Sequence, residues 1–126
     1  MIDYEFLFYN YRGFEIGAFF CEFMGFKVET ENYPDKKQQM RFLNSYLIHF
    51  HGMEPTDEDL KSIYVEANIF SLLSHLFWGS IGLLQSKLSS IEFDYKTYSN
   101  KRISLLINNK ERFLQNDGSQ EFFYQI

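Results

Sequence analysis

The sequence predicts a mainly α-helical domain with one short strand near its start. Four segments carry apolar side chains three and four positions apart, the spacing of one helix face. Signals that open a helix precede three of them, at Pro34-Asp35, at Thr56 and at Asp94. Hydrophobic residues make up 45% of the 126 residues, which suits one domain with a modest core and argues against disorder.

The strand and the first helix are expected before residue 27. Ile2 to Tyr11 mixes Tyr, Phe and Leu with polar residues, which favours a short strand that leads into a loop. Arg12-Gly13 is a turn signal. Glu15 to Phe26 then predicts a helix that Gly25 helps to end. Its expected core face carries Ile16, Phe19, Phe20 and Phe23.

Three longer helices follow a polar loop at Lys27–Tyr33. The first is expected from Pro34-Asp35 to near Gly52. The second follows a capping box at Thr56–Asp59 and continues to about Leu88, with a bend near Gly79 or Gly82. The last is expected from Tyr95 to about Leu114, behind a cap at Asp94. A turn at Asn116-Asp117-Gly118 then leads into a polar and aromatic tail.

Composition narrows the classes of partner. The formal net charge is -5, which argues against nucleic acid, because a phosphate-binding surface needs clustered Lys and Arg. Aromatic residues make up 20% of the chain, and so many rings need either a thick core or a ring-lined pocket. An acidic site for a small cation fits this balance.

Cysteine use and hydropathy predict a cytoplasmic protein without a membrane span. Cys21 is the only cysteine, so no intrachain disulfide can form, and its apolar neighbours indicate a buried, inert thiol. The first residues do not form the basic segment followed by an apolar stretch that marks a signal peptide, so none is expected. Ile69–Leu84 is the most apolar window, but it is interrupted by serines and His75 and is shorter than the ~20 residues of a spanning helix. It predicts a buried helix.

Two features rise above the background of common motifs. Asp3 and Glu5 lie two positions apart on the expected strand, so both carboxylates can face one Mg²⁺ ion; a solvated acidic edge is the alternative. Glu22, together with the rings around Trp78 and from Phe93 to Tyr98, could hold a desolvated cation; an aromatic core is the alternative. His49 and His51 point to different helix faces and do not form a chelating pair. His75 is most simply a core histidine.

Taken in chain order, several motifs resemble the choline/ethanolamine kinase family. The resemblance runs from Ile2 to about Leu114, keeps the family's order and does not depend on one short motif. It implies the C-terminal helical lobe of a protein-kinase-like fold over residues 1–114, with residues 115–126 as a tail. The similar segments are Asp3–Phe6, Tyr9–Gly17, Phe20–Phe23, Tyr33-Pro34, Gln38-Gln39, Asn68–Gly79 and Ser89–Tyr95.

The resemblance also implies an activity and the residues that serve it. The family transfers phosphate from ATP to the hydroxyl of ethanolamine or choline in phospholipid headgroup synthesis. Asp3 resembles the family's magnesium-binding aspartate, and Glu5 lies in the same acidic patch. Glu22 and Trp78 resemble the residues that meet the substrate's ammonium group. The further walls of that pocket are implied at Phe6, Phe93 and Tyr98.

Three residues depart from the family's pattern. Phe6 stands where the family usually has tyrosine, Ile81 where it has a second tryptophan, and Glu15 where it has aspartate. A pocket with one aromatic ring fewer should bind quaternary choline less well, because choline depends on ring faces. Ethanolamine should lose less, because its ammonium group can donate hydrogen bonds to Glu22. The departures therefore favour ethanolamine.

The family's ATP-binding lobe and catalytic base precede the metal aspartate, so no catalytic residue is expected here and the chain alone is expected to be inactive. The alternative is a non-catalytic lobe that pairs with a full-length kinase or binds a cationic headgroup. Apolar surface that lacks a partner lobe would favour self-association, for example as a dimer.

Overall fold

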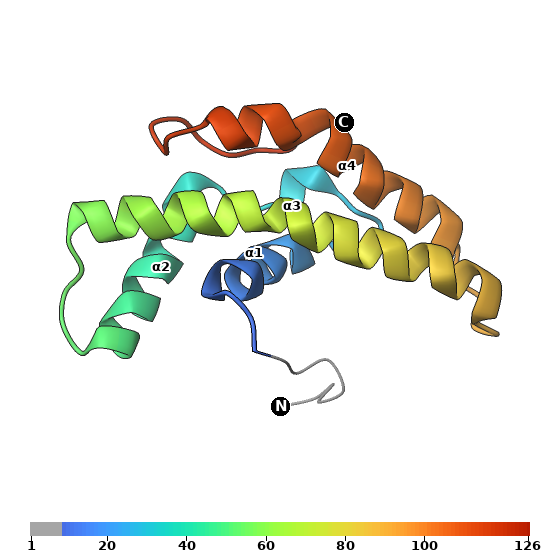
Figure 1. Ribbon diagram of the computed structural model, residues 1–126, viewed down its shortest axis with the longest axis horizontal. Helices are drawn as coiled ribbons and strands as arrows, with labels where there is room; N and C mark the ends of the chain where they lie inside the picture. Colours follow the sequence, from blue (N-terminus) through green and yellow to red (C-terminus); the bar gives the residue numbers. More distant parts are fainter. Residues whose placement is uncertain (1–8) are drawn as a thin grey trace.

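The computed structural model describes residues 9–126 and confirms a mainly α-helical fold (Figure 1). No strand occurs in this range. The strand expected at Ile2–Tyr11 lies mostly outside the described residues, and its last three positions have irregular backbone. The elements are α1 (Arg12–Glu22), the short 3-10 helix η2 (Thr30–Asn32), α2 (Lys36–His51), α3 (Asp57–Leu88) and α4 (Tyr95–Gln115).

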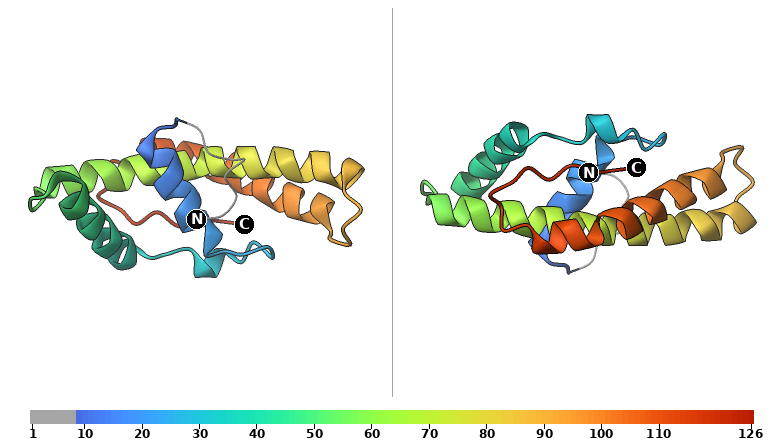
Figure 2. Two further views of the ribbon diagram at one scale, coloured as in Figure 1. Left: turned by 90° about the horizontal axis from the view of Figure 1, so that it is seen from below. Right: turned by 90° about the horizontal axis from the view of Figure 1, so that it is seen from above.

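The long helix α3 is the axis of the fold. α1 crosses it on one side, α4 runs back along its C-terminal half, and α2 diverges from its N-terminal half (Figures 1 and 2). Within residues 9–126, α3 is the one helix long and apolar enough to cross a membrane, with a mean hydropathy of 1.4 in its most apolar window. A central helix of a packed domain has the same length and composition. Here α3 packs against α1, α2 and α4, but 44% of that window is buried, and Leu73, Leu76 and Leu84 are exposed. The prediction of a buried helix therefore holds for one face of α3 only.

Helix α1 differs from its predicted limits at both ends. It begins at Arg12, where a turn was expected, because tertiary contacts hold this segment on α3. The Arg12 guanidinium donates through Nε and Nη2 to Oε2 of Glu66, at 3.1 and 3.0 Å. Gly13 is buried beneath the Glu66 side chain. The helix ends at Glu22, and Gly25, with φ +60°, lies in the turns that follow.

The core face of α1 is narrower than predicted. Ile16 and Phe20 are buried, at 4% and 1% exposed, but Phe19 and Phe23 are 43% and 53% exposed. The two buried side chains share the face on which Gly17 touches α3. Phe19 instead stacks on Phe42 of α2, with ring centroids 5.0 Å apart. The prediction that Phe19 and Phe23 belong to the core was therefore wrong, because they cover a half-exposed aromatic contact towards α2.

The predicted caps at Thr56 and Asp94 are confirmed, whereas Asp35, expected with Pro34 in the first turn of α2, is the N-cap that precedes it. Asp35 and Thr56 each form a capping box, and the Asp94 carboxylate accepts a 2.9 Å hydrogen bond from the Thr97 amide. Gly52 ends α2 in the left-handed region, with φ +71°. α3 continues as a single helix past Gly79 and Gly82 to Leu88. Local signals fixed these ends because each cap satisfies backbone groups that the helix leaves unpaired.

The C-terminal segment is part of the core. After the turn at Gly118 it passes back between α2 and the α3–α4 pair (Figure 2). Phe122 and Tyr124 are 1% and 6% exposed. The Asn109 side chain of α4 bonds both backbone groups of Gln125, each at 2.9 Å. Residues predicted to be a separate tail thus fasten the two longest helices together.

A buried polar cluster lies where α1, α3 and α4 meet. His75 is fully buried, with Nδ1 3.3 Å from Arg102 Nη1 and Nε2 3.8 Å from Cys21 Sγ. Burial, followed by the Arg102 charge, lowers the pKa of His75 to about 3, and burial raises the pKa of Cys21 to about 11. Because a guanidinium only donates, Nδ1 accepts and the ring proton sits on Nε2. The predicted core position of His75 and the predicted burial of the Cys21 thiol are confirmed.

Replacing Gly17 with alanine should destabilise the fold. A Cβ at residue 17 would lie 2.4 Å from the Ala67 carbonyl oxygen and 2.7 Å from the Ser71 amide nitrogen, and this backbone cannot move aside without shifting α3. We expect a loss of about 2 kcal/mol in the free energy of unfolding, measured by urea denaturation. Gly79→Ala is the matched control, because its Cβ would meet the Ile103 side-chain end, which can rotate. Equal losses in both variants would contradict this account.

Stability should fall as the pH drops below the ordinary pKa of histidine. The pKa of His75 is lowered from 6.5 to about 3, so the unfolded chain binds a proton in this range that the folded chain excludes. This one group should remove about 2 kcal/mol between about pH 7.5 and about pH 5, measured by urea denaturation at each pH. His75→Gln, which cannot titrate, should flatten that slope. An unchanged slope in the variant would show that His75 is not its source.

Candidate aromatic pocket

A pocket of about 260 Å³ lies at the end of the molecule where α3 gives way to α4. Its walls come from the C-terminal half of α3, the connection to α4, the first turn of α4 and the loop after α1. The lining residues are Phe26, Trp78, Ile81, Gly82, Ile91, Phe93, Tyr95 and Tyr98. Trp78, Phe93 and Tyr98, which the sequence analysis assigned to one pocket, therefore line the same cavity.

Local structure explains how α4 brings its rings into the pocket. Asp94 caps α4, so Phe93 lies just before the helix, and its ring is 4.8 Å from that of Tyr95 and 5.9 Å from that of Tyr98. Gly82 of α3 permits close approach, because a Cβ there would come within 3.1 Å of the Tyr98 side chain. The Asp94 cap and Gly82 together determine where the rings of Phe93 and Tyr98 contact α3.

The α3 wall of the pocket is half aromatic and half aliphatic. Trp78 packs edge-to-face on Phe77, with ring centroids 5.3 Å apart. Ile81 lines the same cavity one helical turn further on. The departure noted at Ile81 thus lies inside the pocket, where the side chain presents an aliphatic surface.

Glu22, which the sequence assigned to the same pocket, is not among its lining residues. It is the last residue of α1 and is exposed. Its charge acts on the Tyr98 hydroxyl: burial is the largest cause that raises the pKa of Tyr98, and the Glu22 carboxylate raises it further. The structure therefore brings the rings together, whereas the Glu22 carboxylate is not among the lining residues and acts on Tyr98 through its charge.

The loop after α1 contributes a wall that the sequence analysis did not assign. Phe26 is 79% exposed and packs edge-to-face on Phe93, with centroids 5.7 Å apart. Two positions on, Val28 has φ +55°, an unusual conformation for a β-branched residue. The one sequence signal that could have assigned Phe26 to the pocket was its position on the same helix face as Glu22, four residues earlier. Because the chain leaves the helix at Glu22, that shared face could not place its ring.

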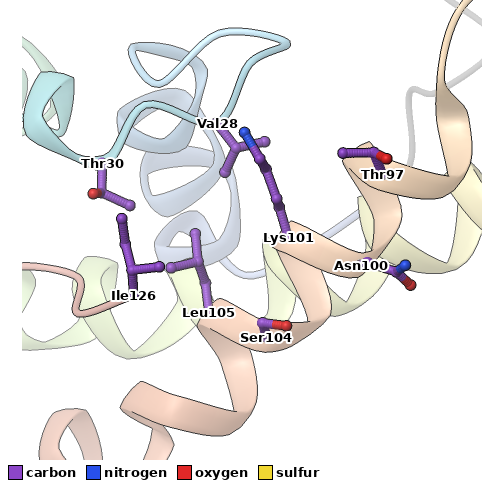
Figure 3. Close-up of a pocket in the computed structure, with 8 residues that line it drawn as sticks. All are labelled: Val28, Thr30, Thr97, Asn100, Lys101, Ser104, Leu105 and Ile126. Carbon is purple, nitrogen blue, oxygen red and sulfur yellow. The ribbon is translucent and has the colours of Figure 1, made fainter.

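A second cavity, of about 290 Å³, lies between this loop and α4 (Figure 3). In the figure the Lys101 side chain extends from α4 towards Val28. Its Nζ donates a 2.6 Å hydrogen bond to the Lys27 carbonyl and so ties the loop to α4. The remaining lining residues are Thr30, Thr97, Asn100, Ser104, Leu105 and Ile126.

The expected metal site cannot be placed. Asp3 and Glu5 lie outside the described residues, as does Phe6 at the expected edge of the pocket. Within residues 9–126, no group of three or more His, Cys, Asp and Glu side chains gathers closely enough to hold a metal ion. His49 and His51 are exposed on the last turn of α2. The magnesium assignment to Asp3 and Glu5 stays a prediction.

Comparisons with known proteins agree with the sequence motifs. The family model for choline/ethanolamine kinase matches residues 1–107. A probable ethanolamine kinase A of Dictyostelium discoideum is 40% identical over 113 residues, covering 90% of this chain and 32% of that protein. Choline kinase alpha of Mus musculus is 36% identical over 127 aligned positions, covering 89% of this chain and 28% of that protein. Ethanolamine kinase 1 of Homo sapiens is 39% identical over 104 positions, covering 78% and 23%.

The chain therefore spans about a third or less of the length of these curated relatives. The match to the family model covers most of the chain and includes the segments that form the aromatic pocket. On this evidence the chain belongs to the choline/ethanolamine kinase family.

Proposed function

We propose that this chain is part of an ATP-dependent ethanolamine kinase that phosphorylates the hydroxyl of ethanolamine, or of choline, for phospholipid headgroup synthesis in the cytoplasm. Within that enzyme it would supply the binding site for the substrate's ammonium group. The observation that supports this role is the aromatic pocket, in which Trp78, Phe93 and Tyr98 line one cavity beside Glu22.

The pocket has the chemistry that a small organic cation needs. Ring faces attract a cation that has lost its water, by about 2 kcal/mol per well-placed ring. The Glu22 carboxylate adds attraction from the side without occupying the cavity. Holding the ammonium group in this way would fix the substrate so that its hydroxyl faces the phosphate donor, which is the main task of a protein in phosphoryl transfer.

The aliphatic wall at Ile81 supports ethanolamine as the preferred substrate. A quaternary ammonium group has no N–H and depends on ring faces and charge, so the ring lost at Ile81 costs it affinity. A primary ammonium can compensate with hydrogen bonds to a carboxylate such as Glu22.

Magnesium and ATP would be bound at the other side of the reaction centre. Asp3 and Glu5 offer carboxylate oxygens, the ligands that Mg²⁺ prefers, and a bound Mg²⁺ offsets charge on the transferring phosphate. The chain matches only part of its relatives, so we propose that ATP binding and the catalytic base come from the regions of those relatives outside the match, and that this chain alone does not catalyse the reaction.

A second candidate function is that of a non-catalytic interaction module. It is favoured by an exposed apolar surface on α3, a groove of about 440 Å³ lined by Leu73, Leu76, Phe77, Ser80, Ile81 and Leu84. Leu84 is 55% exposed. A contiguous apolar surface of this kind on a small domain often marks a contact with another protein or another copy.

Binding to the pocket can be followed directly, because Trp78 is the only tryptophan in the sequence and lines the cavity. Ethanolamine and, more weakly, choline should change its fluorescence in a saturable way. Glu22→Gln, which removes the charge and keeps the shape, should weaken ethanolamine binding by about tenfold.

Glu58→Gln is the control for this measurement. Glu58 lies in the first turn of α3, twenty positions before Trp78 and so roughly 30 Å away along the helix. It should bind as the unchanged chain does. The proposed function fails if neither amine alters the fluorescence, or if both glutamate variants bind equally well.

Self-association through the α3 groove should respond to one charge. Leu84→Glu places a carboxylate in the groove and should shift a concentration-dependent dimer towards monomer, as measured by sedimentation velocity. Ile107→Glu on α4 is the matched control, because Ile107 is 59% exposed outside the groove. A chain that stays monomeric at all concentrations, or equal effects of both variants, would count against the interaction function.

A further inference from the structure

Arg102 is a buried cation that forms no ion pair with a carboxylate of the described residues 9–126. It is 2% exposed, one helical turn after Tyr98 on α4. Within residues 9–126 the ion pairs are Arg12–Glu66 and Lys61–Asp117, and neither involves it. A buried guanidinium without an ionic partner is costly and needs other groups to stabilise it.

The partners of Arg102 lead to the aromatic pocket. Its Nε donates a 3.1 Å hydrogen bond to the Tyr98 hydroxyl oxygen, and its guanidinium carbon lies 5.2 Å from the centroid of the Tyr98 ring. A second nitrogen, Nη1, lies 3.3 Å from Nδ1 of His75. Arg102 does not line the pocket, whereas Tyr98 does. The Tyr98 side chain therefore connects the guanidinium to the wall of the pocket.

This arrangement restrains the tyrosine more than packing alone would. A partly buried aromatic side chain can still rotate about its first torsion angle, but a tyrosine that is hydrogen-bonded at its oxygen and stacked on a planar cation has one favoured position. The guanidinium is itself held by the neutral His75, which is fully buried. The chain of contacts from His75 through Arg102 to Tyr98 joins the rigid core to the pocket wall.

We propose that Arg102 is a positioning residue for ligand binding: it holds the Tyr98 ring against the pocket so that the ring face is ready for the ammonium group. This inference rests on the proposed function of the pocket. The fixed ring reduces the ordering that a ligand must impose, which raises affinity without direct contact between Arg102 and the ligand. The charge of Arg102 by itself would repel a cation, so position and charge act in opposite directions.

Three variants separate these effects. Arg102→Lys keeps the charge and loses the planar donor, Arg102→Met loses both, and Tyr98→Phe keeps the ring and loses the oxygen that Arg102 holds. Positioning predicts that each one weakens ethanolamine binding by about fivefold in the Trp78 fluorescence titration, a change of about 1 kcal/mol. A purely repulsive charge predicts tighter binding in Arg102→Met, which would overturn the proposal.

The double variant with Arg102→Lys and Tyr98→Phe completes a cycle. If Arg102 acts through the Tyr98 hydroxyl, the double variant should bind no more weakly than either single variant. Losses that multiply would mean that the two residues act independently and would contradict the proposal. If the Arg102 variants do not fold, ethanolamine binding by Tyr98→Phe is still a test, because this variant keeps the buried guanidinium in place.

A measurement without ligand separates this inference from the proposed function. Carbon-13 relaxation of the residue 98 ring should report a fixed ring in the unchanged chain and a more mobile one in Arg102→Lys and Tyr98→Phe. If the unchanged chain binds neither ethanolamine nor choline, the proposed function fails, and this measurement still decides whether Arg102 orders the ring. Equal ring mobility in all three proteins would overturn the positioning role.

Discussion

The fold depends on how closely α3 can be approached from both sides. On one side Gly17 brings α1 so near that its α-carbon faces the backbone of Ala67 and Ser71, with no room for a side chain. On the other, Gly82 lets Tyr98 and Ser99 of α4 lie against the same helix. Close approach of a helix on each side buries the middle of α3 in a small domain. It also fixes the direction in which α4 returns.

The location of the pocket follows from this packing. Where Gly82 meets the first turn of α4, the two helices are close, but the connection between them must still turn through Ile91 and Phe93. This connection leaves a space at the end of the α3–α4 pair, and aromatic side chains from the connection and from both helices line that space. The loop after α1, tied to α4 through Lys101 and Lys27, closes the remaining side with Phe26. The pocket is thus built by the end of α3, its connection to α4 and the start of α4, together with a loop that lies far from them in the sequence.

The sequence predicted those features that local chemistry decides. The ends of α2, α3 and α4 were predictable because their caps lie in the chain next to the backbone groups that they satisfy. The start of α1 was not, because the ion pair of Arg12 with Glu66 overrides the turn signal of Arg12-Gly13. That the rings of Trp78, Phe93 and Tyr98 share one pocket was predicted from the resemblance to a family. The periodicity of the sequence alone was equally compatible with an aromatic core. Phe26 could not be assigned, because its place depends on a left-handed turn at Gly25 and on a tertiary contact with Phe93.

Core and pocket are not independent parts of this molecule. Cys21 and His75 are fully buried, and burial holds each in an uncharged form, as the raised pKa of Cys21 and the lowered pKa of His75 indicate. A neutral His75 can accept from Arg102, whereas a protonated ring would repel it. Burial keeps the His75 ring from taking up a proton, so Nδ1 stays available to accept a hydrogen bond. This allows the Arg102 guanidinium to lie behind Tyr98. The stability of the core and the geometry of the pocket then rest on the same contacts, so a substitution that loosens one is expected to loosen the other.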